Sequence, residues 1–124
     1  PDPTFAMGHK CSEFTPPVLN LGAHVAPLGM KFYTGSMFPA SYKNNILIAE
    51  HGSWNRHQYQ GARIVRVIVG PDGKNPKQEV LASGWIEGKQ GYTGRPADIV
   101  MAKDGSILVA DDWAGAIYRI SYKK

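Results

Sequence analysis

The chain alternates between short runs of β-branched and aromatic residues and segments rich in glycine, proline and asparagine, a pattern typical of short strands joined by turns. The runs fall into two sets. They are 29–33, 46–50, 63–69 and 79–86, then 98–102, 107–110 and 116–122. A further short run at 18–21 predicts one more strand, and helix patterns are almost absent. The pattern therefore predicts an all-β fold.

The two sets of strands repeat each other in sequence. The matching segments are 26–32 with 95–101, 46–50 (ILIAE) with 107–111 (ILVAD), and 61–67 with 115–120. A repeat of short strands with loops of variable length is the signature of β-propeller blades, which cannot bury their faces alone. We expect about two four-stranded antiparallel blades, the first over residues 21–90 and the second over residues 91–124.

A chain of 124 residues is too short for a complete propeller, so we expect partner chains or further sequence to complete a ring. The second set has only three strands, and residues 18–21 are placed to close it, in the same chain or in a neighbour. They equally suit the outer strand of a preceding blade. Within the N-terminal segment 1–20, residues 1–8 are compatible with a tag remnant, and we expect no regular structure there.

The strand order sorts the loops onto two faces, because alternate loops of an up-and-down blade emerge on the same side. Residues 22–27, 51–61, 91–96 and 111–115 then share one face. Its side chains include His24, His51, Trp54, Arg56, His57, Tyr59, Tyr92, Arg95, Asp111, Asp112 and Trp113. The loops of the opposite face have ordinary turn compositions. Any chemistry is therefore expected on the first face.

Composition excludes several functions. The net charge is +4, but the lysines and arginines are scattered rather than gathered in a stripe, so we expect no nucleic-acid partner. Cys11 is the only cysteine, which excludes an intrachain disulfide and CxxC chemistry. No apolar run approaches the roughly 20 residues that span a bilayer, and no signal peptide is visible.

The richest candidate segment is HGSWNR at residues 51–56, directly after a strand. A histidine acts as a base or hydrogen-bond donor, a tryptophan offers a flat stacking surface, and an arginine binds a carboxylate through two parallel bonds. In the alternative interpretation, Trp54 packs between blades while Asn55 and Arg56 fold the loop. The residue types alone favour neither.

Three further positions carry charge at strand ends. Arg95 precedes Pro96 and is either a ligand-binding cation or a salt-bridge partner of Asp98 or Asp111. The pair Asp111 and Asp112 more often caps a turn than binds a metal, so the metal ligands stay unknown. A lone loop histidine such as His24 is usually structural or exposed.

Several segments resemble the carboxy-terminal part of the pyrroloquinoline quinone (PQQ) dependent sugar dehydrogenases, of the L-sorbosone dehydrogenase type. They are 21–30 (LGAHVAPLGM) with 32–33, 51–56 (HGSWNR), 94–96 (GRP), 104–106 with 111–112, and 117–122 (IYRISY). The resemblance runs from about residue 21 to residue 122 in unbroken order, and the HGSWNR hexapeptide is its most specific motif.

The resemblance implies a six-bladed propeller that oxidises aldose or sorbosone sugars, passing two electrons to PQQ held beside Ca²⁺. It further implies that Arg95 pairs with a PQQ carboxylate, that His51 lies near the quinone, and that His24, Trp54 and Arg56 line the same pocket. It also suggests a bacterial periplasmic or secreted location. In that family the general base and most of the calcium-binding backbone belong to upstream blades, so we assign no catalytic residue in this chain.

Three hypotheses follow for the function. The chain is an oxidoreductase fragment or assembling subunit, a non-catalytic module that binds an anionic ligand, or a structural module that oligomerises to cover its open faces. Only the first makes it an enzyme, and only with a completed ring. Three copies of two blades make six, so we expect a homotrimer.

Overall fold

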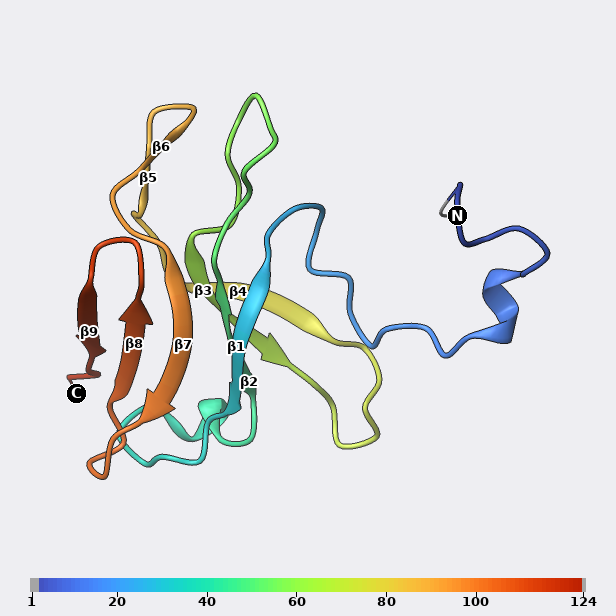
Figure 1. The fold of residues 1–124 in the computed structure, drawn as a ribbon. Coiled ribbons are helices and arrows are strands. Elements are labelled where there is room, and N and C mark those ends of the chain that lie inside the picture. The colour runs from blue at the N-terminus through green and yellow to red at the C-terminus, as the bar shows by residue number, and fades with distance from the viewer. Residues whose placement is uncertain (1–2, 124) are drawn as a thin grey trace.

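The computed structural model describes residues 3–123 and is almost entirely β-structure (Figure 1). Its elements are the 3₁₀ helices η1 (Cys11–Glu13) and η2 (Ala40–Tyr42) and the strands β1 (Pro27–Phe32), β2 (Ile46–Glu50), β3 (Arg63–Ile68), β4 (Lys77–Ala82), β5 (Ile86–Glu87), β6 (Gly91–Tyr92), β7 (Pro96–Met101), β8 (Ile107–Asp111) and β9 (Ala116–Ile120). They form antiparallel sheets in the order β1-β2-β3-β4, β5-β6 and β7-β8-β9. The expectation of an all-β fold is confirmed.

The structure differs from the expected strands in two places. The run 79–86 divides, because β4 ends at Ala82 and a separate two-stranded sheet of β5 and β6 follows. The run 18–21 forms no strand. Leu19 and Leu21 instead pack against Ile48, Val65 and Val67 on the outer face of the first sheet. Because residues 18–21 lie on the face of the first sheet, they do not pair with the edge strand of a sheet.

The main core lies between the two larger sheets, where β1 and β2 contact β7. Leu47 and Ile64 of the first sheet and Ile99 and Val109 of the second are buried there. The close approach depends on Gly29, because a Cβ at this position would lie 2.6 Å from the Cα of Asp98. Burial of this shared apolar surface fixes the sheets against each other.

The outer faces of both sheets remain apolar. Val100 and Ile117 on the second sheet are 53% and 75% exposed, and a shallow groove of about 120 Å³ runs beside them. On the first sheet, Met30 and Ile46 border a groove of about 220 Å³ that Leu19 and Leu21 also line. Contiguous apolar faces of this kind mark surfaces that bind another protein segment.

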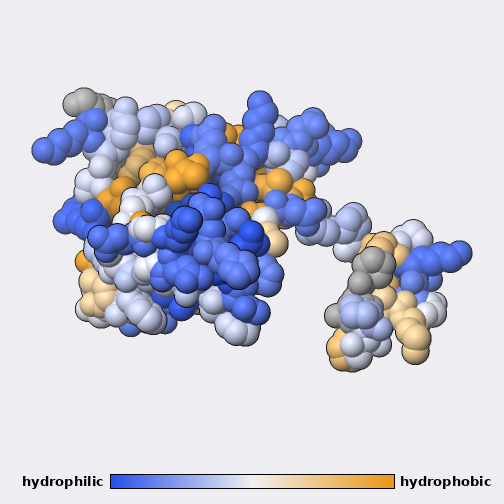
Figure 2. All heavy atoms as spheres, turned by 90° about the horizontal axis from the view of Figure 1, so that it is seen from above, coloured by the Kyte–Doolittle hydropathy of each residue, from blue (hydrophilic) through white to orange (hydrophobic). Residues whose placement is uncertain are grey.

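Seen from above, a large cluster of hydrophilic side chains lies in front of hydrophobic areas on the larger body of the molecule (Figure 2). The N-terminal segment that carries η1 stands apart from the sheets in both views (Figures 1 and 2). Within residues 3–123, no helix has the length and apolar character needed to cross a membrane.

Candidate functional site

Three loops meet at the end of the molecule drawn uppermost in Figure 1. They are residues 51–62 after β2, residues 93–95 before β7, and residues 112–115 after β8. The strand order predicts these loops on one face. A side-chain pair of His51 and Asp112, and hydrogen bonds from the side chains of Tyr92 and Arg95 to backbone carbonyls, join them there, so residues far apart in sequence form one surface.

Arg95 clamps the first of these loops. Its Nε donates to the carbonyl oxygen of His51 at 3.0 Å, and its Nη2 donates to the carbonyl oxygen of Gly52 at 2.9 Å. The guanidinium also lies over the rings of Tyr92 and Trp113, at 4.7 and 5.9 Å from their centroids. Among residues 3–123, Nη1 and one hydrogen of Nη2 have no hydrogen-bond partner.

Arg95 forms no salt bridge with another residue of the part 3–123. Among residues 3–123, no carboxylate lies within ion-pair distance of its guanidinium. The alternative of a salt bridge to Asp98 or Asp111 is therefore wrong, although the backbone N–H of Arg95 donates to Asp111 Oδ1 at 2.9 Å. An arginine that is immobilised but unpaired is suited to bind an anion.

Asp111 organises the turn after β8. Its Oδ1 accepts the backbone N–H groups of Arg95, Trp113 and Ala114, at 2.9, 3.1 and 2.8 Å. Its Oδ2 is buried without a hydrogen-bond partner in the described part of the chain. A Cβ at Gly94 would lie 2.1 Å from that oxygen, so only glycine fits there. The carboxylate thus has the turn-capping role that the sequence favoured over metal binding.

His51 and Asp112 form a direct pair across the two larger sheets. His51 Nε2 lies 2.8 Å from Asp112 Oδ1. The His51 side chain is 17% exposed, and that of Asp112 is 62% exposed. The hydrogen bond from His51 holds the pKa of the Asp112 carboxyl below its ordinary value. A histidine and its carboxylate partner therefore lie beside the unpaired arginine.

The other three candidate residues lie away from this cluster. His24 and Arg56 border an open recess of about 370 Å³, together with Asn55, His57 and Gln58. Trp54 is 77% exposed. The loop that carries it is closed by a hydrogen bond from the N–H of Ser53 to the carbonyl of Gln60 at 2.9 Å, and it projects from the sheets (Figure 1). The structure therefore brings His51 next to Arg95, and it places His24 and Arg56 together at the border of the recess.

The strand order predicts Tyr92, Asp112 and Trp113 on this face but gives them no role in binding. The sequence does indicate that Asp112 lies near His51, because the repeat aligns 46–51 (ILIAEH) with 107–112 (ILVADD) and so puts the two residues at equivalent positions. Equivalent strand ends of neighbouring sheets meet at the same end of the molecule. The aromatic rings surround Arg95 in space and share no sequence pattern with it.

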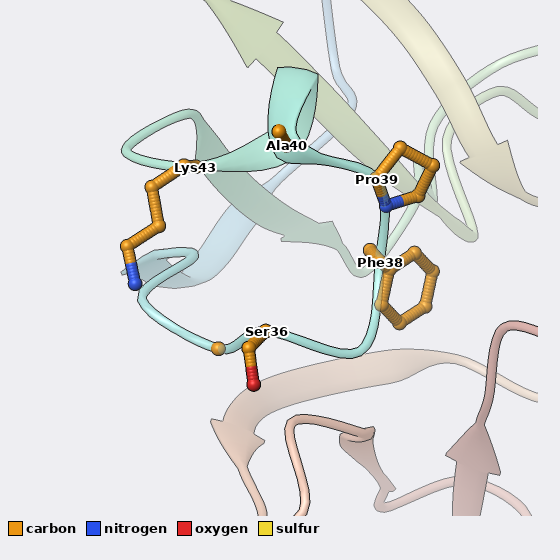
Figure 3. Close-up of a pocket in the computed structure, with 6 residues that line it drawn as sticks. Ser36, Phe38, Pro39, Ala40 and Lys43 are labelled. Atoms are coloured by element: carbon orange, nitrogen blue, oxygen red, sulfur yellow. The ribbon is translucent and has the colours of Figure 1, made fainter.

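A hollow of about 340 Å³ lies at the opposite end of the sheets, in the loop between β1 and β2 (Figure 3). Ser36, Phe38 and Lys43 border it, and the Lys43 ammonium donates to the carbonyl oxygen of Thr34 at 2.5 Å. None of the candidate residues reaches this hollow. It belongs to the face for which the sequence predicted ordinary turns.

The donor set around Arg95 fits one of the two implied cofactors. A guanidinium with free N–H groups, a histidine and flanking aromatic rings suit a planar ligand that carries carboxylates. Calcium takes six to eight oxygen ligands. Within residues 3–123, no group of three or more His, Cys, Asp or Glu side chains comes together, so these side chains do not form a calcium site.

Comparison with known proteins gives a family match. The family model described as TrAA12-like matches residues 3–123. An uncharacterized protein of Borreliella burgdorferi is 40% identical over 116 residues, which are 93% of this chain and 31% of that protein. The PQQ-dependent pyranose dehydrogenase of Coprinopsis cinerea is 45% identical over 51 residues, which are 41% of this chain and 6% of the enzyme.

Solved structures agree in fold. The holo form of the pyranose dehydrogenase PQQ domain from Coprinopsis cinerea superposes with a TM-score of 0.61 and 26% identity, covering 80% of this chain and 27% of that one. A Trichoderma reesei enzyme of carbohydrate-active family AA12 gives a TM-score of 0.55 at 24% identity, covering 78% of this chain and 25% of that one. These neighbours have propeller-like folds. The chain spans less than a third of each relative's length.

Proposed function

The chain belongs to the TrAA12-like family, and on that basis we propose that it is a PQQ-binding portion of a PQQ-dependent sugar dehydrogenase. The observation that carries the proposal is Arg95, a clamped guanidinium that has no carboxylate partner among residues 3–123 and keeps free N–H donors. In this proposal Arg95 binds a carboxylate of PQQ, and His51 lies beside the quinone. When bound, PQQ supplies a two-electron acceptor for sugar oxidation.

The remaining candidate residues have supporting roles in this proposal. Arg56 and His24 border the neighbouring recess and bind a further carboxylate of a ligand that bears three. Trp54 offers an exposed ring for stacking. Most of the calcium-binding backbone belongs to the upstream blades that the resemblance implies, and no calcium ligand is assigned in this chain. The substrate class is an aldose or sorbosone, and the location is periplasmic or extracellular.

Assembly is the second part of the proposal. The outer faces of the two larger sheets expose apolar side chains, including Met30 on the first and Ile117 on the second, which are 57% and 75% exposed. Packing the second sheet of one copy on the first sheet of the next, beside Leu19 and Leu21 that already cover part of it, buries the apolar side chains that remain exposed on both faces. Such head-to-tail contacts close into a ring, and three copies give the homotrimer proposed from the repeat.

Titration calorimetry with PQQ tests the binding site. Replacing Arg95 by alanine should weaken binding by about 1.5–3 kcal/mol, the usual contribution of a hydrogen bond to a charged group. Arg119→Ala is the matched control, because Arg119 is an exposed arginine paired with Asp104 in a turn at the opposite end of the second sheet. Equal affinity in wild type and Arg95→Ala, or no binding by either, contradicts the proposal.

Activity is a separate question from binding. We expect PQQ-dependent dye reduction on aldoses and sorbosone to be undetectable or very weak for this chain alone. A positioned general base contributes about 10²–10⁴-fold to such reactions, and the sequence assigns none here. Robust turnover that disappears in His51→Ala would instead make the assembled chain a complete enzyme.

A further inference from the structure

Hydrogen bonds hold the backbone on both sides of the contact between His51 and Asp112. His51 follows β2, and its N–H donates to the carbonyl of Ala26 at 2.8 Å while its own carbonyl accepts from Arg95. Asp112 follows β8, in the turn that the Asp111 carboxylate caps. Because both backbones are fixed, the 2.8 Å contact between His51 Nε2 and Asp112 Oδ1 is not a chance encounter of mobile side chains.

The chemistry of the carboxylate decides which ring nitrogen carries the proton. An ionised carboxylate is acceptor only, so His51 must donate from Nε2. The lowered pKa of Asp112, caused first by this hydrogen bond, agrees with an ionised partner. A neutral imidazole has a single N–H, so its Nδ1 then carries a lone pair.

That lone pair is available. In the described part of the chain, His51 Nδ1 has no hydrogen-bond partner, and the His51 side chain keeps 17% of its surface exposed. Arg95 donates to the carbonyl oxygen of His51 rather than to its ring. Asp112 is thus the one charged side chain hydrogen-bonded to the imidazole among residues 3–123.

We propose that Asp112 is a positioning residue that holds the neutral form of His51 in the Nε2–H tautomer, so that Nδ1 accepts a hydrogen bond from a hydroxyl group of the sugar. The choice of a sugar hydroxyl as the donor rests on the proposed function. The tautomer itself does not, because it follows from a contact within the chain. The proposal gives Asp112 an indirect role, exercised through His51.

Nitrogen-15 spectra of the histidine rings test the tautomer without any ligand. They are recorded about two pH units above the ordinary histidine pKa of about 6.5, where imidazoles are neutral. The His51 signals are identified by their loss in His51→Gln. We expect wild-type His51 to show a protonated Nε2 and an unprotonated Nδ1. Asp112→Asn should shift both signals toward the averaged values of mixed tautomers, because an amide either accepts from or donates to Nε2.

The control is Asp72→Asn, which removes an exposed carboxylate from the turn between β3 and β4. It should leave the His51 signals unchanged. Thermal unfolding of each variant separates loss of the tautomer from loss of the fold. A wild-type His51 protonated on Nδ1, or an Asp112→Asn spectrum identical to the wild type, overturns the proposal.

A second arm follows the Nδ1 signal during titration with D-glucose. We expect a saturable shift in the wild type and roughly tenfold weaker saturation in Asp112→Asn, since tenfold corresponds to about the free energy of one hydrogen bond. An Nδ1 signal that does not respond to glucose overturns the acceptor role. Failure of PQQ binding with the expected tautomer contradicts the proposed function instead, so the two failures are distinguishable.

Discussion

Arg95 donates its Nε–H to the carbonyl oxygen of His51, 44 residues earlier in the chain, at 3.0 Å. This bond joins the loop that leaves the first sheet to the residue just before the second. The guanidinium fixes this loop with two of its N–H groups, and in the proposed function the N–H groups that have no partner among residues 3–123 bind the ligand. His51 is held beside Arg95 by this bond, and Asp112 is held in turn by its contact with His51 Nε2.

The hydroxyl of Tyr33 provides a test of how the two larger sheets are connected at the end opposite the candidate site. It donates to the carbonyl of Gly105 at 2.8 Å and accepts the N–H groups of Met37 and Phe38 at 3.1 and 3.0 Å. Because the residue is fully buried, Tyr33→Phe leaves these groups unsatisfied and should lower the free energy of unfolding by about 1–3 kcal/mol. Urea denaturation measures this, with Tyr122→Phe as the exposed control. Equal losses in the two variants contradict the expectation.

Asp111→Ala tests the turn that carries Asp112 and Trp113. The substitution removes the acceptor of three backbone N–H groups, and hydrogen bonds to a charged group are worth about 1.5–3 kcal/mol each. We expect a loss of at least that size in the free energy of unfolding. Asp72→Ala, an exposed acid at the turn between β3 and β4, should change it little. If Asp111→Ala leaves the free energy of unfolding unchanged, the turn does not depend on the carboxylate.

Much of the fold follows from the sequence because alternation and turn residues are local signals. Strand β2 has the bounds expected from the pattern, and the repeat gave the strand order of both larger sheets. The small sheet of β5 and β6 was not predicted, because strands of two residues are too short to show an alternation of polar and apolar positions. Residues 18–21 are apolar enough for a strand, but their side chains are used to cover a sheet face.

The site was predictable to a lesser degree. Sorting the loops by strand order correctly brought His51 and Arg95 to one end, since that depends only on topology. No local sequence pattern indicates that the loop around Trp54 folds on itself through Ser53 and Gln60. Nor does one indicate that Arg95 donates to backbone carbonyls of the chain rather than to one of its carboxylates. Such choices depend on contacts between segments distant in sequence.

The ionised carboxylate of Asp104 should stabilise the fold, and this contribution should be lost on acidification. Hydrogen bonds from the Ser106 hydroxyl and then the Ser106 N–H, at 2.7 and 3.0 Å, hold the pKa of Asp104 below its ordinary value, and Arg119 adds to this. A lowered pKa stabilises the fold above the unfolded-state value of about 3.9, and that contribution is lost as pH falls through the folded-state value. The stability difference between wild type and Asp104→Asn should therefore shrink from pH 7 toward pH 3. A difference that grows on acidification contradicts this.

Ile117→Asp tests the assembly. Ile117 is 75% exposed on the outer face of the second sheet, so the change should leave the stability of a single chain nearly unaltered. A charge buried between copies is costly, so the variant should be monomeric in light scattering while the wild type has the mass of a trimer. Lys103→Asp, in the exposed turn between β7 and β8, is the control and should stay trimeric. A stable wild-type monomer contradicts the homotrimer.

PQQ binding by Arg95 is measured most directly from the side-chain Nε–H signal of this residue in nitrogen-15 spectra during titration with PQQ. We expect a saturable shift of this signal together with the backbone signals of His51 and Asp112. The Nε–H signal of Arg119, at the opposite end of the second sheet, should stay unchanged. An Arg95 signal that does not move at saturating PQQ, or shifts confined to the end that carries Arg119, would mean that Arg95 does not bind PQQ.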